Sequence, residues 1–151
     1  MGLDYSLELV TELQPLQSLR LLVDRLGLHW WDESHLGGPA LWISAGVQTA
    51  RWRALMEEAF HFSPNLSVPF RLDPNAPEYR QGDRLMMRAA LLLLEHGQEG
   101  ALLFNGESIV LQRLKGHLVL NEDFGGWTDG PEWEKDVYLP YERRSLPSPL
   151  L

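Results

Sequence analysis

Two turn dipeptides near the C-terminal end of the chain constrain the fold more than any other feature. Asn105-Gly106 and Lys115-Gly116 separate three runs rich in apolar residues. A two-residue hairpin turn requires positive φ at its central positions, which glycine adopts freely and asparagine tolerates. The spacing of the two dipeptides therefore predicts a three-stranded antiparallel meander over residues 101–121.

The turn positions also fix the expected register of this meander. Leu102 would face Ile109 across the first turn, and Leu111 would face Leu120 across the second. Side chains alternate across a strand, so one face of the meander becomes apolar and would form the floor of the core, while the opposite face is mixed. The residues expected on the core face are Leu102, Phe104, Ile109, Leu111, Leu118 and Leu120.

Shorter patterns predict the strands and helices that pack with the meander. Residues 3–9 alternate apolar and polar side chains, which is typical of a half-buried strand. Residues 15–26 are apolar at helical spacing, with Pro15 suited to the first helical position and Gly27 to the position after the last. Similar patterns predict helices over 51–60 and 78–96, strands over 41–48 and 68–72, and a short strand with a loop within 28–39.

Two of these segments carry a further expectation about their place in the fold. The strand over 68–72 contains Pro69, which cannot donate to a ladder, so we expect an edge strand or a bulge there. The helix over 78–96 is apolar nearly all round in its second half, so we expect it to be the central helix over the sheet.

The size of the chain suits one core. With 151 residues, of which 44% are hydrophobic, it is long enough for one compact domain and short for two. The predicted fold class is α+β: a single domain over 1–146 with a flexible tail at 147–151. Its antiparallel-rich sheet would have the helices over 15–26 and 78–96 packed on one face and the β-meander towards the C-terminus.

Charge and cysteine content limit the possible partners and compartment. The net charge of −8 opposes nonspecific binding to nucleic acid or anionic membrane. It can attract a basic partner protein, but moderate acidity is common in soluble proteins and solubility is the simpler interpretation. There is no cysteine, which excludes disulfides and thiolate metal sites and fits a reducing cytoplasm. The N-terminus lacks a basic region followed by an apolar block, and the longest apolar run is 89–94, so neither a signal peptide nor a membrane span is expected.

No common enzyme signature occurs in the sequence. Phosphate-binding glycine loops, nucleophile elbows and zinc-protease helices are all missing, so no catalytic residue and no cofactor is predicted. The most metal-like cluster is His29, Asp32, Glu33 and His35, but its spacing matches no metal template and favours a solvated loop. Whether this tryptophan-rich 28–39 stretch belongs to the core or to an interface stays open.

The segment 122–141 is the feature least explained by folding alone, because carboxylates alternate there with large aromatic rings. Such a segment can bind a basic surface, with the rings as anchors and the acids steering the partner. Alternatively, the rings fold back to cap the sheet and leave the acids in water. The candidate partner-binding residues are Glu122, Asp123, Trp127, Asp129, Glu132, Trp133, Glu134 and Asp136.

Several strand and turn sequences together resemble a known family. They are Leu3-Asp4-Tyr5-Ser6-Leu7, Ser67-Val68-Pro69-Phe70-Arg71-Leu72-Asp73, Leu103-Phe104-Asn105-Gly106-Glu107, Leu118-Val119-Leu120-Asn121 and Leu139-Pro140-Tyr141. In order and spacing they are similar to the third type of Sit (swarming inhibition toxin) immunity protein, over about residues 2–146. The acidic insertion around 123–136 and the tryptophans near residue 30 are particular to this chain.

The resemblance implies a function in competition between bacteria. Sit families belong to bacterial polymorphic toxin systems, in which each immunity protein neutralises a cognate toxin. The implied function is non-enzymatic neutralisation by tight binding to that toxin, and the resemblance maps no functional residues onto this chain. A small-molecule or regulatory binding module is the alternative, and the oligomeric state stays open.

Overall fold

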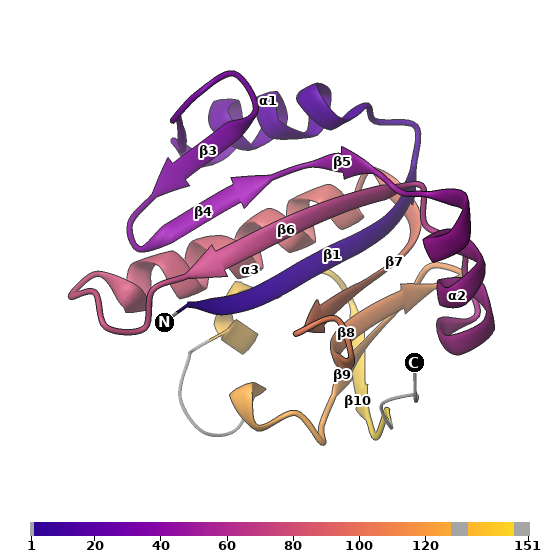
Figure 1. Ribbon diagram of the computed structural model, residues 1–151. Helices are drawn as coiled ribbons and strands as arrows, with labels where there is room; N and C mark the ends of the chain where they lie inside the picture. The colour runs from indigo at the N-terminus through magenta and orange to yellow at the C-terminus, as the bar shows by residue number, and fades with distance from the viewer. Residues whose placement is uncertain (1, 128–132, 147–151) are drawn as a thin grey trace.

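The structure is a computed structural model that describes residues 2–127 and 133–146. Its strands form one sheet in the order β10-β9-β8-β7-β1-β6-β4-β3-β2, with β5 paired beside β4 on β6 (Figure 1). The strands are β1 (Leu3–Thr11), β2 (His29–Trp30), β3 (His35–Gly38), β4 (Leu41–Ser44), β5 (Gly46–Val47), β6 (Leu66–Leu72), β7 (Gly97–Phe104), β8 (Ser108–Leu114), β9 (His117–Asn121) and β10 (Tyr141–Arg144). The helices are α1 (Pro15–Leu26), α2 (Ala50–Phe60), α3 (Tyr79–Leu94) and the short 3₁₀ turns η1 (Gly125–Trp127) and η2 (Trp133–Asp136).

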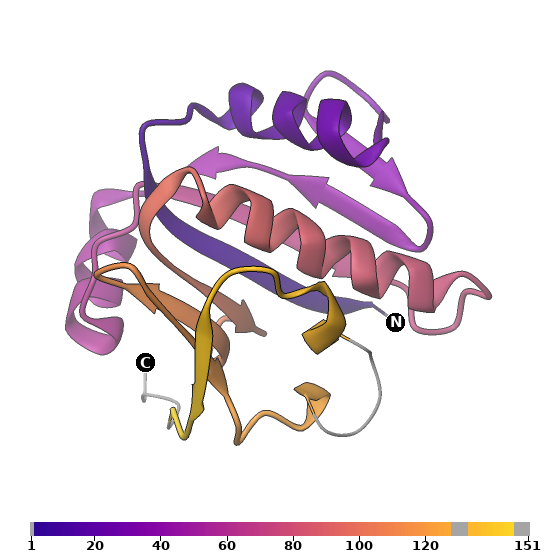
Figure 2. The same cartoon turned by 180° about the vertical axis from the view of Figure 1, so that it is seen from behind.

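Strand β1 lies at the centre of the sheet, between β6 and β7. Its alternating pattern puts Tyr5, Leu7 and Leu9 into the main core, where α1 and α3 cover them. Figure 2 shows both helices on this face of the sheet. The α+β fold class, with an antiparallel-rich sheet and the helices α1 and α3 on one face, is therefore confirmed.

Helix α2 covers the opposite face of the sheet over β7 and β8. Met56 and Phe60 of α2 pack there against Leu103 and Ile109 in a second, smaller apolar cluster. The sheet is thus buried on both sides at this end. This burial explains why both faces of the meander carry apolar residues.

The expected register of the meander is correct at its second turn and wrong at its first. Leu111 faces Leu120 as predicted, but Leu102 faces Leu111 instead of Ile109. The pairing shifts between Leu102 and Leu103, where a bulge adds a residue to β8. As a result Ile109 turns away from the main core and packs under α2.

The prediction of an edge position or a bulge at Pro69 is wrong. Strand β6 is interior, with β1 on one side and β4 and β5 on the other, and its pairing with β1 runs through Pro69 without a shift. On the other side Pro69 falls between Ser67, which pairs with β5, and Phe70, which pairs with β4. Both pairings keep one register, so the gap in the ladder falls at Pro69 itself, which has no N–H to donate.

The C-terminal part is more regular than the sequence predicts. Strand β10, which none of the sequence patterns predicts, pairs in parallel with β9 from Tyr141 to Arg144. The 28–39 segment likewise forms the hairpin of β2 and β3 in place of one strand and a loop. The predicted tail at 147–151 lies outside the described residues, so the domain boundary at 146 stays a prediction.

Candidate functional site

The two tryptophans of the 122–141 segment lie inside the protein. Trp127 is 7% exposed and Trp133 is 1% exposed. The indole N–H of Trp127 donates to the carbonyl oxygen of Val110 over 2.8 Å, and the ring of Trp133 packs against Tyr5 and Phe124. In this arrangement neither ring is available to a partner, and both close one end of the core.

Asp136 is engaged in an internal ion-pair network. Its carboxylate accepts hydrogen bonds from Arg84 at 3.0 and 3.1 Å and from Arg88 at 3.0 Å, and its side chain is only 6% exposed. Burial acts to raise the pKa of Asp136, but the hydrogen bonds and charges of the two arginines outweigh it and hold that pKa below its usual range. Asp136 therefore fastens η2 to α3.

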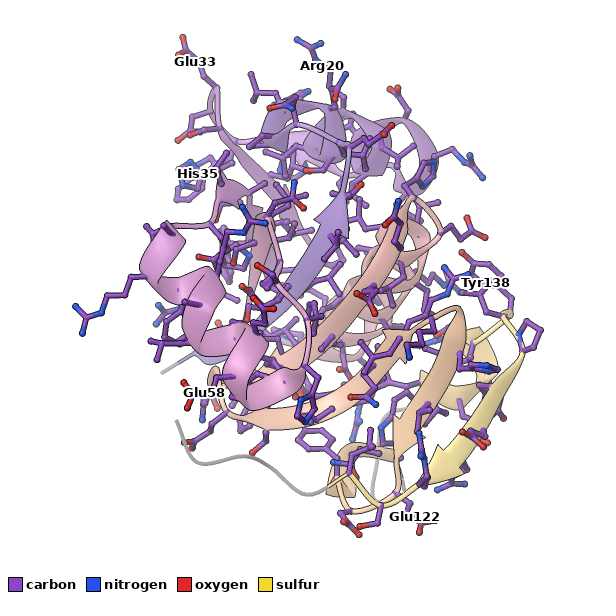
Figure 3. All side chains as sticks on the ribbon, turned by 90° about the vertical axis from the view of Figure 1, so that its right-hand side faces the viewer. Arg20, Glu33, His35, Glu58, Glu122 and Tyr138 are labelled. Carbon is purple, nitrogen blue, oxygen red and sulfur yellow. The ribbon has the colours of Figure 1, made fainter. Side chains whose placement is uncertain are left out.

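The other carboxylates of the segment differ in how much surface they offer. Glu134 accepts from Tyr141 at 2.8 Å and from Arg143 at 3.2 Å, so it joins η2 to β10. Asp123 is exposed and accepts a hydrogen bond from Ser145. Glu122 is exposed on the far side of the molecule from α1 (Figure 3). Two further candidates, Asp129 and Glu132, lie outside the described residues.

Asp83 of α3 is the buried hydrogen-bond acceptor of Trp133. It is 0% exposed, and one carboxylate oxygen, Oδ1, accepts the indole N–H of Trp133 at 2.8 Å. Its other oxygen, Oδ2, has no hydrogen-bond partner in the part of the chain that the structure describes. Burial raises the pKa of Asp83 from 3.8 to about 6, against the opposing effects of the Trp133 hydrogen bond and the Arg80 charge.

A second region of interest is the part of the sheet that α2 leaves uncovered, which we call the open face. Cross-strand pairs place Asp4 beside Arg71, Arg71 beside Trp42, and Ser6 beside Pro69. His35 of β3 completes the set through its pairing with Ser44. We define the open face as the surface formed by Asp4, Ser6, His35, Trp42, Pro69 and Arg71.

The open face contains a shallow hollow of about 380 Å³. It lies over β1, β6 and β4 and is bounded by the Asn105-Gly106 turn at one side and by His35 at the other. Trp42 at its wall is 37% exposed. A surface of this kind offers a large ring and a depression next to each other.

The histidine and carboxylate cluster of the 28–39 segment borders this face without forming a metal site. The Nδ1 atom of His35 lies 2.8 Å from Asp32 Oδ1, and the Trp31 ring meets the His35 ring edge-on at 6.2 Å. His29 instead lies over Gly37 on the neighbouring strand. Across residues 2–127 and 133–146, no three histidine or carboxylate side chains converge as metal ligands.

The two tryptophans of this segment are at the surface, whereas its leucines Leu28 and Leu36 are buried in the core. Trp31 is 66% exposed and Trp30 is 39% exposed. Trp30 pairs with Leu36, a core residue, and therefore points to the α1 side of the sheet. Trp42 pairs with Arg71 and points to the opposite side, so two similarly exposed indoles mark the two faces.

A buried carboxylate lies next to the open face, under α2. Glu8 is 2% exposed and accepts hydrogen bonds from Gln48 and, at 2.7 Å, from Ser67. Burial raises its pKa, and these hydrogen bonds act in the other direction. The alternation of β1 predicts that Glu8 shares the face of Asp4 and Ser6, but only α2 explains why it is buried.

The protein is an α+β sheet protein. Helices α1 and α3 cover one face of the sheet, and the other face is covered in part by α2 and otherwise forms the open face with Trp42. None of the helices described is long and apolar enough to cross a membrane. The chain belongs to the SitI3-like family, whose model matches residues 3–131. No curated protein and no solved structure matches the chain.

Proposed function

We propose that this protein is an immunity protein that binds a cognate bacterial toxin and neutralises it without catalysing a reaction. The observation that carries the proposal is the SitI3-like family match, because it covers residues 3–131 and so nearly the whole described fold. The resemblance to Sit immunity proteins in strand and turn sequences agrees with it. In this proposal the protein acts in the cytoplasm of the cell that it protects.

The proposed mechanism is occlusion of the toxin's functional surface. An immunity protein must bind quickly and tightly, and a net charge of −8 speeds the approach of a basic partner. Among the described candidates of the 122–141 segment, Glu122 and Asp123 are the exposed carboxylates that contribute to this steering. Glu134 and Asp136 are less suited to it, because they already pair with arginines of the same chain.

Co-expression tests the proposal directly. The product of the neighbouring upstream gene is induced in a susceptible host with and without this chain, and survival is counted. The proposal expects rescue by the wild-type chain and a stable complex of the two purified proteins. A Leu7→Asp variant serves as an unfolded control, since Leu7 is fully buried in β1. Killing that continues in the presence of folded wild-type protein would reject the proposal.

The alternative of a small-molecule binding module would be supported by a hollow such as the one on the open face. Its volume of about 380 Å³ falls within the range of ligand pockets. Such pockets bury most of their ligand, whereas this hollow has the sheet beneath it and solvent above. A protein partner that covers the hollow fits this geometry better.

A further inference from the structure

We infer that the open face is where the toxin docks, with two anchoring side chains: Trp42, and Trp31, whose ring lies against His35 at the edge of this face. The inference rests on the proposed function and adds to it the surface and the chemistry of contact. The expected partner is a protein that places a projecting apolar side chain in the hollow beside Trp42 and charged side chains near Asp4 and Arg71.

The first argument is that two large aromatic side chains, Trp31 and Trp42, are exposed to solvent. Trp31 is 66% exposed and Trp42 is 37% exposed, while Trp127 and Trp133 are buried. A tryptophan carries the largest apolar surface of any side chain, and its burial in an interface is among the commonest sources of binding energy. Trp42 therefore retains unburied ring surface that a partner can cover.

The second argument is rigidity. Trp42 and Arg71 stand on the paired strands β4 and β6, and Asp4 stands on β1 at the centre of the sheet. Side chains held by a hydrogen-bonded sheet lose little freedom on binding, which favours affinity. The hollow between them is already formed before any partner arrives.

The third argument is the order of charges across the face. Asp4, Arg71 and Trp42 follow one another in a single cross-strand row, so a negative, a positive and an aromatic group lie side by side. Asp4 has no ion-pair partner among the described residues. A partner can pair with the negative, the positive and the aromatic group together in only one orientation. This requirement gives specificity in addition to affinity.

Size indicates that the open face is the centre of an interface rather than all of it. Four strand spacings separate β1 from β2, which is about 19 Å at the usual spacing of about 4.8 Å. A stable complex buries about 800 Å² on each partner, which needs a wider patch. Figure 3 shows Glu33 and His35 on the same side of the molecule as α2 with Glu58, and these elements can supply the rim.

The test compares two tryptophans that are similarly exposed on opposite faces of the sheet. Trp42→Ala and the double variant Trp31→Ala/Trp42→Ala remove the anchors, whereas Trp30→Ala is the matched control at 39% exposure. Affinity for the purified upstream gene product is measured by calorimetry, and thermal unfolding checks that each variant folds. We expect the Trp42 variant to bind at least about 30-fold more weakly and the Trp30 variant to bind within about 3-fold of wild type.

The outcomes separate this inference from the proposed function. Wild-type binding with an unchanged affinity of the folded double variant would overturn the docking site and leave the immunity function intact. Loss of binding only in a Glu122→Gln/Asp123→Asn variant would move the site to the C-terminal segment and likewise overturn it. A concentration-dependent dimer of the wild type that Trp42→Ala abolishes would assign the face to a second copy of the chain. No binding by the wild type would reject both proposals.

Discussion

Trp133 and Asp83 meet inside the protein, fifty residues apart in the chain, through an indole N–H that donates to the Oδ1 atom over 2.8 Å. This hydrogen bond joins η2 to α3. It is a buried contact between an aromatic donor and an acidic acceptor whose second oxygen has no partner among the described residues. Two of the following predictions concern this pair.

Asp83→Asn should change how stability depends on pH. Because burial raises the pKa of Asp83 from 3.8 to about 6, its native state holds a proton that the unfolded chain has released between these values. Wild-type stability from this group therefore falls as pH rises from about 4 to 6. The asparagine does not titrate, so the free energy of unfolding of the variant should gain about 2–3 kcal/mol relative to wild type between pH 4 and pH 7.

Urea unfolding of both proteins at several pH values measures this difference. The part of the difference that does not depend on pH arises from the amide itself, so only the change of the difference with pH tests the prediction. A difference that stays flat from pH 4 to pH 7 would show that burial does not raise the pKa of Asp83.

Trp133→Phe should destabilise the fold although it keeps an aromatic ring in place. The change leaves both oxygens of Asp83 without a hydrogen-bond donor among the residues that the structure describes, and it removes part of a ring that is 1% exposed. We expect a loss of about 3 kcal/mol in the free energy of unfolding, from the stranded carboxylate and the lost volume together. Trp30→Phe, at a surface tryptophan, should cost less than about 0.5 kcal/mol in the same urea titration.

Asp136→Asn should loosen the C-terminal segment. The amide cannot replace the charge-assisted bonds to Arg84 and Arg88, but both arginines are nearly half exposed and stay hydrated. The expected loss at pH 7 is therefore moderate, about 1–2 kcal/mol. Since the pKa of Asp136 is lowered in the folded state, the difference from wild type should be full above pH 4 and shrink as pH falls below that value.

The matched control for this change is Glu122→Gln, at an exposed carboxylate that makes no side-chain hydrogen bond or ion pair in the described parts of the chain. Chemical denaturation in low and high salt reports both variants. An Asp136 variant as stable as the Glu122 variant would mean that the arginine contacts contribute nothing to folding.

Gly82→Ala should destabilise the protein in spite of its helical position. An added Cβ would lie 2.1 Å from the carbonyl oxygen of Pro39, which belongs to the backbone and has little room to yield. Overpacking of this kind costs about 3 kcal/mol or more, against about 1 kcal/mol gained from alanine in a helix. A net loss of about 2 kcal/mol should appear in thermal and urea unfolding.

Gly46→Ala provides the contrasting case within the same chain. No atom lies within 4 Å of the Cβ that would be added there, and its backbone is not in the left-handed region. That variant should unfold within about 1 kcal/mol of wild type. Equal behaviour of the two variants would indicate that α3 and the turn before β4 separate easily.

Local signals in the sequence were enough to predict most individual elements. Pro15 and Gly27 mark the ends of α1 because both act through their own backbone, and the alternation over residues 3–9 reflects one covered face. The second turn of the meander is likewise correct, since Lys115-Gly116 adopts positive φ at both positions.

The predictions that were wrong concern contacts between residues that are distant in the chain. Ile109, Val110 and Leu111 are consecutive apolar residues, so either register gives an apolar face and only the bulge decides between them. The interior place of Pro69 depends on β4 and β5, which pair with β6 on either side of the proline, and the sequence of β6 alone does not predict these neighbours.

The candidate site shows the same limit. The sequence grouped rings and acids of the 122–141 segment into one surface, but α3 supplies the acceptor for one ring and the arginines for one acid. Trp42 escaped notice because Leu41, Trp42 and Ile43 are all apolar, and such a run does not say which side chain faces outward. Only the pairing with β6 fixes that.

The pairing of β10 with β9 affects how a partly synthesised chain behaves. It runs parallel to β9 and is its outer neighbour, so β9 has an unpaired side until residues 141–144 have been synthesised. β9 contains Leu118, Val119 and Leu120, and an open strand of such residues recruits the same strand from other molecules. A nascent or prematurely terminated chain that lacks Tyr141 is therefore prone to aggregate, and the last strand protects the finished protein from this fate.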